Sequence, residues 1–361
     1  MTIRKVTLYF ILLLLSLPSS YADETFSGQV NILAWFGYIS DDDQYIKAIE
    51  KECNTKIFYD QYYSGDEFLD RFQQNREDYN IIIFPETIFK LISADISNKN
   101  SDLYQNARHY NPIIYNHYTH QKFPHNVVFF NHALMGFLYN KSVINLTEGD
   151  TIYSMFHKAG NNTVVMIDDA VETEFLLSLG IRQATESKAK FGGNNSLTPL
   201  KLNNFKKLYQ GSSVIITNSF QKISTTPSFA FAFQWSGDAF NFLQHAPNLT
   251  FFVHPKLSYV SSDLLANLDN KRPTVCVANA LASRVFLAHM QDKIYYFSPY
   301  GDKPSKKDAM FTSFYNTWMH DLPTLPWIDS VTKARFAQLQ REWNLIKLQL
   351  DEDNSKKSSH E

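Results

Sequence analysis

Three short segments of the sequence place acidic or aromatic side chains directly after predicted strands. They are Trp35-Phe36-Gly37-Tyr38, Asp168-Asp169-Ala170-Val171-Glu172 and Trp235-Ser236-Gly237-Asp238. Open parallel sheets bind ligands beyond the carboxyl ends of their strands, so a ligand is expected to lie at these positions. Carboxylates hold ammonium groups through charge-assisted hydrogen bonds, while aromatic faces pack methylene groups and attract cations. The segments therefore predict a cleft for a slender organic cation.

The elements that must position these segments follow a parallel α/β pattern. In the first part of the chain, strands are predicted at 30–35, 56–59 and 79–85, alternating with helices at 42–53, 65–72 and 87–96. Later strands are predicted at 127–130, 135–139, 164–167, 213–216, 228–234 and 250–253, and later helices at 168–179, 273–290 and 335–350. Apolar strands that alternate with helices are typical of parallel sheets covered on both faces.

The N-terminal segment predicts export. Arg4 and Lys5 precede an apolar run that ends at small residues, which is the pattern of a cleavable signal peptide over residues 1–22, cut before Asp23. No cysteine stands near that cut, so we expect a soluble periplasmic protein rather than a lipid-anchored one. Removing the segment changes the formal net charge from −2 to −4. Such a small negative net charge does not suggest nucleic acid binding.

The length of the chain and its two cysteines constrain the fold further. A mature chain of about 340 residues exceeds what one hydrophobic core usually serves, so two lobes are expected. Cys53 and Cys276 stand far apart in the sequence. An oxidising compartment permits a disulfide between them, but spacing alone does not pair them, and two buried free thiols are the alternative.

In the order of its acidic and aromatic residues, the chain resembles the periplasmic spermidine/putrescine-binding proteins of bacterial ATP-driven transporters. The resemblance covers essentially the whole mature chain. The family pattern has a W-x-x-Y segment after the first strand and a D-x-x-E pair that opens a helix of the second lobe. These are followed by a tryptophan, by an aspartate at the return to the first lobe, and by a tyrosine shortly before a proline. The matching residues are Trp35, Tyr38, Asp169, Glu172, Trp235, Asp263 and Tyr296.

The resemblance implies a fold of the α/β class, the two-lobed type II periplasmic-binding-protein fold. Each lobe is expected to hold a mainly parallel sheet flanked by helices, with the ligand cleft at the hinge. We expect the first lobe over 28–132 and 260–300, and the second lobe over 133–259 together with C-terminal helices in 301–350. Residues 351–361 are expected to form a flexible tail.

The function that the resemblance implies is that of a monomeric solute receptor and not of an enzyme. Such a receptor binds a polyamine without a cofactor and delivers it to an inner-membrane ABC permease. In that role Asp169, Glu172 and Asp263 hold the amines, while the four matched aromatic residues pack against the methylene chain. Buried acids without a cation repel one another, so the empty cleft is expected to be open and wet.

The chain departs from the family pattern in two places. The family usually has a tryptophan two residues before the aspartate, where this chain has Ser261, so one wall of the pocket is missing unless Tyr259 fills it. After the third strand, Glu86 and Ile88 stand where the family tends to have a serine and a tyrosine. Glu86 is therefore expected to add an acid to the ligand site, and Ile88 to remove a ring.

Each of these residues also has an interpretation without a ligand. Asp169 and Glu172 fit the N-terminal capping pattern of a helix, and tryptophans at strand ends often belong to the core. Capping and core packing are therefore the alternatives to ligand binding, and only the joint pattern favours the ligand.

Other classes of function stay open as alternatives. A loose group of histidines matches no compact metal-ligand spacing, although a metal-binding receptor is one alternative. These are His109, His117, His120, His125 and His132. A sensor module that uses the same fold is another. The sequence has no phosphate-binding loop, nucleophile elbow or C-x-x-C motif that would indicate an enzyme.

Overall fold

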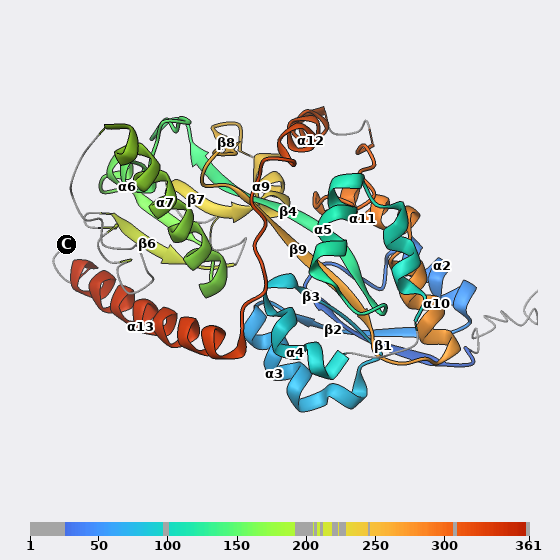
Figure 1. The fold of residues 1–361 in the computed structure, drawn as a ribbon. Coiled ribbons are helices and arrows are strands. Elements are labelled where there is room, and N and C mark those ends of the chain that lie inside the picture. Colours follow the sequence, from blue (N-terminus) through green and yellow to red (C-terminus); the bar gives the residue numbers. More distant parts are fainter. Residues whose placement is uncertain are drawn as a thin grey trace, which may run out of the picture.

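The chain folds into two lobes that share one continuous sheet (Figure 1). The computed structural model describes residues 26–96, 101–191, 205, 208–209, 212–218, 223, 229–244, 246–305 and 309–358. The predicted signal peptide, residues 1–22, lies outside these ranges. Within them the sheet has nine strands in the order β2-β1-β3-β9-β4-β7-β5-β6, with β8 paired to β4. The predicted α/β architecture is confirmed.

In the first lobe, three parallel strands form one end of the sheet: β1 (Gln29–Trp35), β2 (Lys56–Tyr62) and β3 (Ile81–Pro85). The isoleucine-rich β3 is buried along nearly all its length, as expected for a parallel strand covered on both faces. The helices of this lobe are α2 (Gln44–Cys53), α3 (Gly65–Asn75), α4 (Phe89–Ile96), α5 (Pro112–Gln121), α10 (Arg272–Leu281) and α11 (Arg284–Ile294). Short 3-10 segments lie at Arg76–Asp78, Glu86–Ile88 and Leu103–His109.

One helix predicted over 273–290 is in fact two, α10 and α11. Ser283 adopts an extended conformation between them and accepts a hydrogen bond from the Phe286 amide, which caps α11. A serine at this position offers the backbone an alternative to the helical hydrogen-bond pattern, and this breaks the predicted run.

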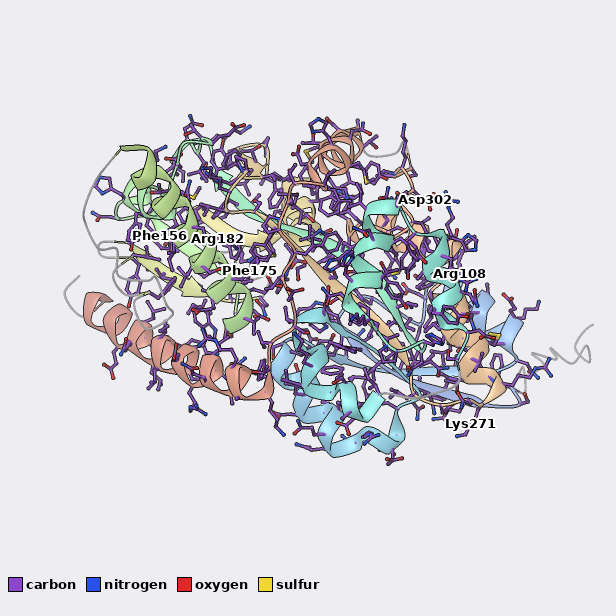
Figure 2. The ribbon with its side chains drawn as sticks, viewed as in Figure 1. Arg108, Phe156, Phe175, Arg182, Lys271 and Asp302 are labelled. Atoms are coloured by element: carbon purple, nitrogen blue, oxygen red, sulfur yellow. A yellow bond between two sulfur atoms is a disulfide. The ribbon has the colours of Figure 1, made fainter. Side chains whose placement is uncertain are left out.

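In the second lobe, β5 (Thr163–Met166), β6 (Ser213–Ile216) and β7 (Phe229–Trp235) are again parallel. Among the described residues of this lobe, the other elements are α6 (Ile152–Ala159), α7 (Ala170–Phe191), α9 (Ser236–Leu243), β8 (Leu249–Phe252) and α13 (Lys333–Ser358). Phe156 of α6 packs edge-on against Phe231 of β7, with ring centroids 5.4 Å apart. Figure 2 labels Phe156 and Phe175 in this lobe, and Arg108, Lys271 and Asp302 in the first.

Two long antiparallel strands, β4 (Val127–Asn140) and β9 (Tyr259–Asn267), cross from one lobe to the other (Figure 1). The prediction of two separate strands at 127–130 and 135–139 is wrong, because β4 continues through both and all of its residues are buried. The sequence did not predict β9, whose polar centre hides its strand character. A bulge between Phe129 and Asn131 places Asn131 opposite Asp263.

Each lobe has its own hydrophobic core. We expected 301–350 to belong to the second lobe, and α13 does pack there through Leu339 and Trp343. However, α12 (Ala309–Asp321) buries Trp318 in the first core, where its ring stacks on Phe297 with centroids 4.6 Å apart. The chain then returns to the second lobe beside β9, where Val260 donates a backbone hydrogen bond to the Pro326 carbonyl.

The C-terminal helix is longer than predicted. We expected a flexible tail after residue 350, but the backbone of α13 stays helical to Ser358. Among the described residues, no helix combines the length and the apolar character that crossing a membrane requires.

A disulfide joins Cys53, the last residue of α2, to Cys276 in α10. The alternative of two free thiols is therefore wrong. The bridge links segments 223 positions apart in the sequence and ties α2, the first helix of the described residues, to the helix that follows β9. Closing so long a loop removes much conformational freedom from the unfolded chain.

We expect the double variant Cys53→Ser/Cys276→Ser to lose about 2–5 kcal/mol of its free energy of unfolding, because its unfolded chain regains that freedom. Urea unfolding followed by circular dichroism measures this. Reductant should lower the stability of the wild type and leave the double variant unchanged. Equal stability of oxidised wild type and double variant would contradict a stabilising role for the bridge.

Candidate functional site

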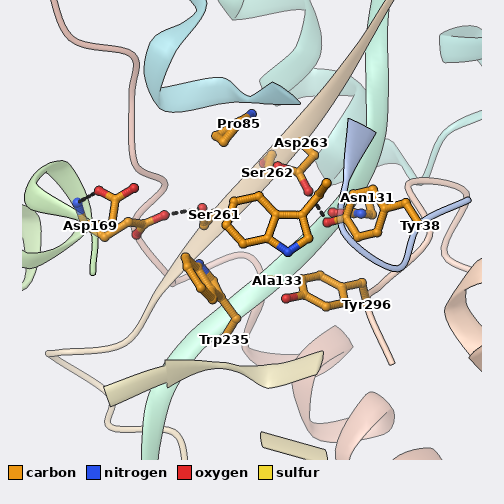
Figure 3. A pocket seen from close by; sticks show the side chains of 12 residues that line it. Tyr38, Pro85, Asn131, Ala133, Asp169, Trp235, Ser261, Ser262, Asp263 and Tyr296 are labelled. Carbon is orange, nitrogen blue, oxygen red and sulfur yellow. Dashed lines mark hydrogen bonds between the residues drawn. The ribbon is translucent and has the colours of Figure 1, made fainter. Parts of the chain in front are cut away.

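A pocket lies between the two lobes, beyond the carboxyl ends of β1 and β7 and against the crossing strands (Figure 3). We call it the inner pocket. Its lining consists of Trp35, Tyr38, Pro85, Asn131, Ala133, Asp169, Glu172, Trp235, Ser261, Ser262, Asp263 and Tyr296. Seven of the eight predicted ligand-binding residues line it, and the exception is Glu86. The structure thus brings together residues from both lobes that are far apart in the sequence.

Aromatic rings form the walls of the inner pocket. The ring centroid of Trp35 lies 5.8 Å from that of Trp235, with the planes inclined at 72°. Tyr38 and Tyr296 meet edge to face, with centroids 6.1 Å apart. The Tyr296 ring packs directly on the backbone of Gly237, where a Cβ atom would overlap it. Only glycine at this position lets Tyr296 reach the pocket.

The second lobe contributes two acids from the start of α7. The Asp169 carboxylate accepts hydrogen bonds from the backbone amides of Val171 (2.8 Å) and Glu172 (2.9 Å), so Asp169 caps the helix and lines the pocket at once. Glu172 accepts hydrogen bonds from the hydroxyl groups of Tyr259 and Ser261, both at 2.5 Å. The capping interpretation and the ligand interpretation are therefore compatible. Ser261, where the family has a tryptophan, positions Glu172.

The first lobe contributes Asp263 from the middle of β9. Its register places it between Pro85 of β3 and Asn131 of β4. The Tyr38 hydroxyl donates a hydrogen bond to its carboxylate, as Figure 3 shows. Asp263 is therefore held by neutral neighbours on a strand that belongs to both lobes.

Burial raises the pKa of all three carboxyl groups. Loss of hydration raises the pKa of Asp169 to about 6 and the pKa of Asp263 to about 6. The pKa of Glu172 rises to about 8, because burial and then the nearby Asp169 charge disfavour its ionised form. No lysine or arginine lines the inner pocket, and no ion pair among the described residues includes these acids. The described protein therefore does not neutralise their charge.

Asp238 is an acid next to the inner pocket, and the predicted ligand residues do not include it. It lies in the first turn of α9, beside Tyr296, and burial raises its pKa to about 7. The signal was present, because Asp238 belongs to one of the three segments that follow predicted strands. The family pattern includes only Trp235 from that segment, so the resemblance does not mark Asp238.

The prediction that Glu86 contacts a ligand is not supported by its position. Its side chain is only 1% exposed and is absent from the pocket lining. The 3-10 turn over Glu86–Ile88 directs it towards α5, where its Oε1 lies 3.5 Å from Nε2 of His117. Pro85 lines the pocket instead, while Ile88 is buried in the first core.

The predicted histidine group does not assemble around a metal site. In the part of the chain that the structure describes, no three His, Cys, Asp or Glu side chains are arranged to hold a metal ion. His117 stacks on Trp327 with centroids 4.1 Å apart, and Nδ1 of His132 lies 3.0 Å from the Ser262 hydroxyl. These contacts are structural.

Comparison with known proteins by sequence finds no matching family model and no matching curated protein. Solved structures with the same fold are found at low identity. The spermidine/putrescine ABC transporter substrate-binding protein PotD from Streptococcus pneumoniae is 16% identical, with a TM-score of 0.64 over 88% of this chain and 99% of that one. A putative spermidine/putrescine ABC transporter protein from Listeria monocytogenes is 16% identical, with a TM-score of 0.67 over 88% and 98%.

The TpPotD lipoprotein of Treponema pallidum is 14% identical, with a TM-score of 0.63 over 88% of this chain and 99% of that one. Other proteins with this fold are a periplasmic thiamin-binding protein, a receptor solved with acarbose and a protein solved with glucopine. These proteins are named for binding solutes and not for catalysing reactions. The likeness confirms the two-lobed type II periplasmic-binding-protein fold, so the ligand must be argued from the pocket.

The raised pKa values predict how the stability of the ligand-free protein depends on pH. The unfolded chain has carboxyl pKa values near 4, so between about pH 4 and pH 8 the folded state binds more protons than the unfolded state. The stability that these extra bound protons give the folded state is complete below about pH 4. It is lost as pH rises through the pKa values of the folded protein. We therefore expect the variants Glu172→Gln and Asp263→Asn to flatten the decline of unfolding free energy with pH.

Each unit of pKa shift that a variant removes changes the stability difference across this range by about 1.4 kcal/mol. Urea unfolding at a series of pH values measures it. Glu77→Gln removes a charge from an exposed position and serves as the control. If the unfolding free energy of both pocket variants falls with pH as steeply as that of the wild type, these acids do not bind protons in the folded state.

Proposed function

We propose that the protein is a periplasmic solute receptor that binds a polyamine, putrescine or spermidine, and delivers it to an ABC permease in the inner membrane. The observation that carries this proposal is the chemistry of the inner pocket. Buried carboxyl groups enter from both lobes, aromatic rings stand between them, and the lining has no basic side chain. A polyamine carries ammonium groups a few methylenes apart, so it matches separated acids with apolar faces between them.

Each lobe has its own part in the proposed complex. Asp169 and Glu172 pair with an amine from the second lobe, and Asp263 pairs with another from the first. The rings pack the methylene groups and add cation–π contacts of about 0.5–2 kcal/mol each. Because a bound cation attracts acids of both lobes, it favours the closed arrangement through a shift of population.

The charge of the pocket favours an organic cation over a neutral or anionic solute. A neutral sugar would leave the buried carboxyl groups without a counter-ion, and an anion would be repelled. A cation removes this cost, so an organic cation is favoured over both. The disulfide between Cys53 and Cys276 supports an oxidising compartment such as the periplasm.

Calorimetric titration with putrescine, spermidine, spermine, lysine, arginine, thiamin and zinc ions tests the ligand class. We expect a polyamine to bind best. The variants Asp169→Asn and Asp263→Asn should each weaken its binding by about 2 kcal/mol, because each leaves an ammonium group without a charged partner.

Glu77→Gln is again the matched control, since it removes an exposed acid outside the pocket and should bind as the wild type does. The proposal fails if no amine binds, or if both pocket variants keep the wild-type affinity.

A further inference from the structure

A second pocket, which we call the outer pocket, adjoins the inner one. Trp35, Tyr38 and Tyr296 line both pockets, so the two lie against the same three rings. The outer pocket adds the side chains of Phe36 and Tyr63, which follow β1 and β2. A ligand anchored in the inner pocket that passes the shared rings therefore reaches Phe36 and Tyr63.

Phe36 and Tyr63 form an aromatic pair that the hydrophobic cores do not use. Their rings stack with centroids 4.8 Å apart and planes inclined at 24°. Phe36 is 51% exposed and Tyr63 is 54% exposed, and neither belongs to a core cluster of the described residues. Two large rings that keep half their surface in water at the edge of a binding cleft offer apolar area that a ligand can cover.

Two acids line the outer pocket: Asp238 lies beside Tyr296, a ring that both pockets share, and Asp168 is already paired. The Asp168 carboxylate accepts hydrogen bonds from the Trp343 indole (2.8 Å) and from the Lys347 ammonium (3.0 Å). Asn218 is uncharged and joins the lobes, because its amide donates to the Tyr63 carbonyl (3.4 Å) and its Oδ1 accepts from the Asp168 amide (2.7 Å). The end of the cleft at Phe36 and Tyr63 therefore suits an uncharged aromatic group better than another ammonium group.

We propose that the ligand is a polyamine with an aromatic substituent on one terminal nitrogen. Its free amines lie against the acids of the inner pocket, and its ring lies on Phe36 and Tyr63 in the outer pocket. This inference rests on the proposed function of the inner pocket and narrows its ligand class.

Calorimetric titration with two probes, putrescine and N-benzylputrescine, tests the inference. We expect the benzyl probe to bind the wild type at least about tenfold more tightly, since it buries an additional aromatic ring. In the double variant Phe36→Ala/Tyr63→Ala this advantage should disappear while the affinity for putrescine stays unchanged. Phe58→Ala, which removes a ring that is 49% exposed on β2 and outside both pockets, should keep the advantage.

Equal affinity of the wild type for both probes would overturn the inference, as would an advantage that persists in the double variant. These outcomes leave the polyamine proposal for the inner pocket intact. If neither probe binds the wild type, the proposed function itself fails and this inference falls with it. Circular dichroism of the double variant should match the wild type, because both side chains are half exposed.

Discussion

The site depends on buried carboxyl groups whose charge the described protein does not cancel. Asp169, Glu172 and Asp263 are held by backbone amides and hydroxyl groups, which fix their positions but supply no positive charge to stabilise their ionised forms. Their raised pKa values are the consequence of that arrangement. In the proposed complex a cation between them supplies the missing opposite charge and so stabilises their ionised forms.

Strand β9 holds the acids of the pocket in place. Successive side chains on one face of a strand are two residues apart. Tyr259 and Ser261 therefore reach Glu172 in the second lobe, and Asp263 faces Tyr38 in the first. This one strand thus positions acids on both sides of the pocket. The same strand joins the two lobes, so the position of these acids depends on the segment that connects the lobes.

The sequence predicted the parts of the site that follow parallel strands, because the position after such a strand is fixed by the sheet. It failed where local pattern and tertiary packing disagree. The centre of β9 is polar because it serves the site, so no apolar alternation revealed it. The short turn after β3 sends Glu86 away from the pocket, which no residue spacing shows. The packing of α12 on the first core depends on contacts with distant residues such as Phe297.

Proton release on amine binding tests the central claim most directly. Titrating spermidine near pH 6.5 in two buffers of different ionisation enthalpy counts the protons exchanged. This pH lies between the ordinary pKa of a glutamate, about 4.3, and the raised value of about 8 for Glu172. The account predicts that protons leave the protein, because pairing with ammonium lowers the carboxyl pKa values. Binding heats that are equal in the two buffers would contradict it, since the acids would then carry no protons for the cation to displace.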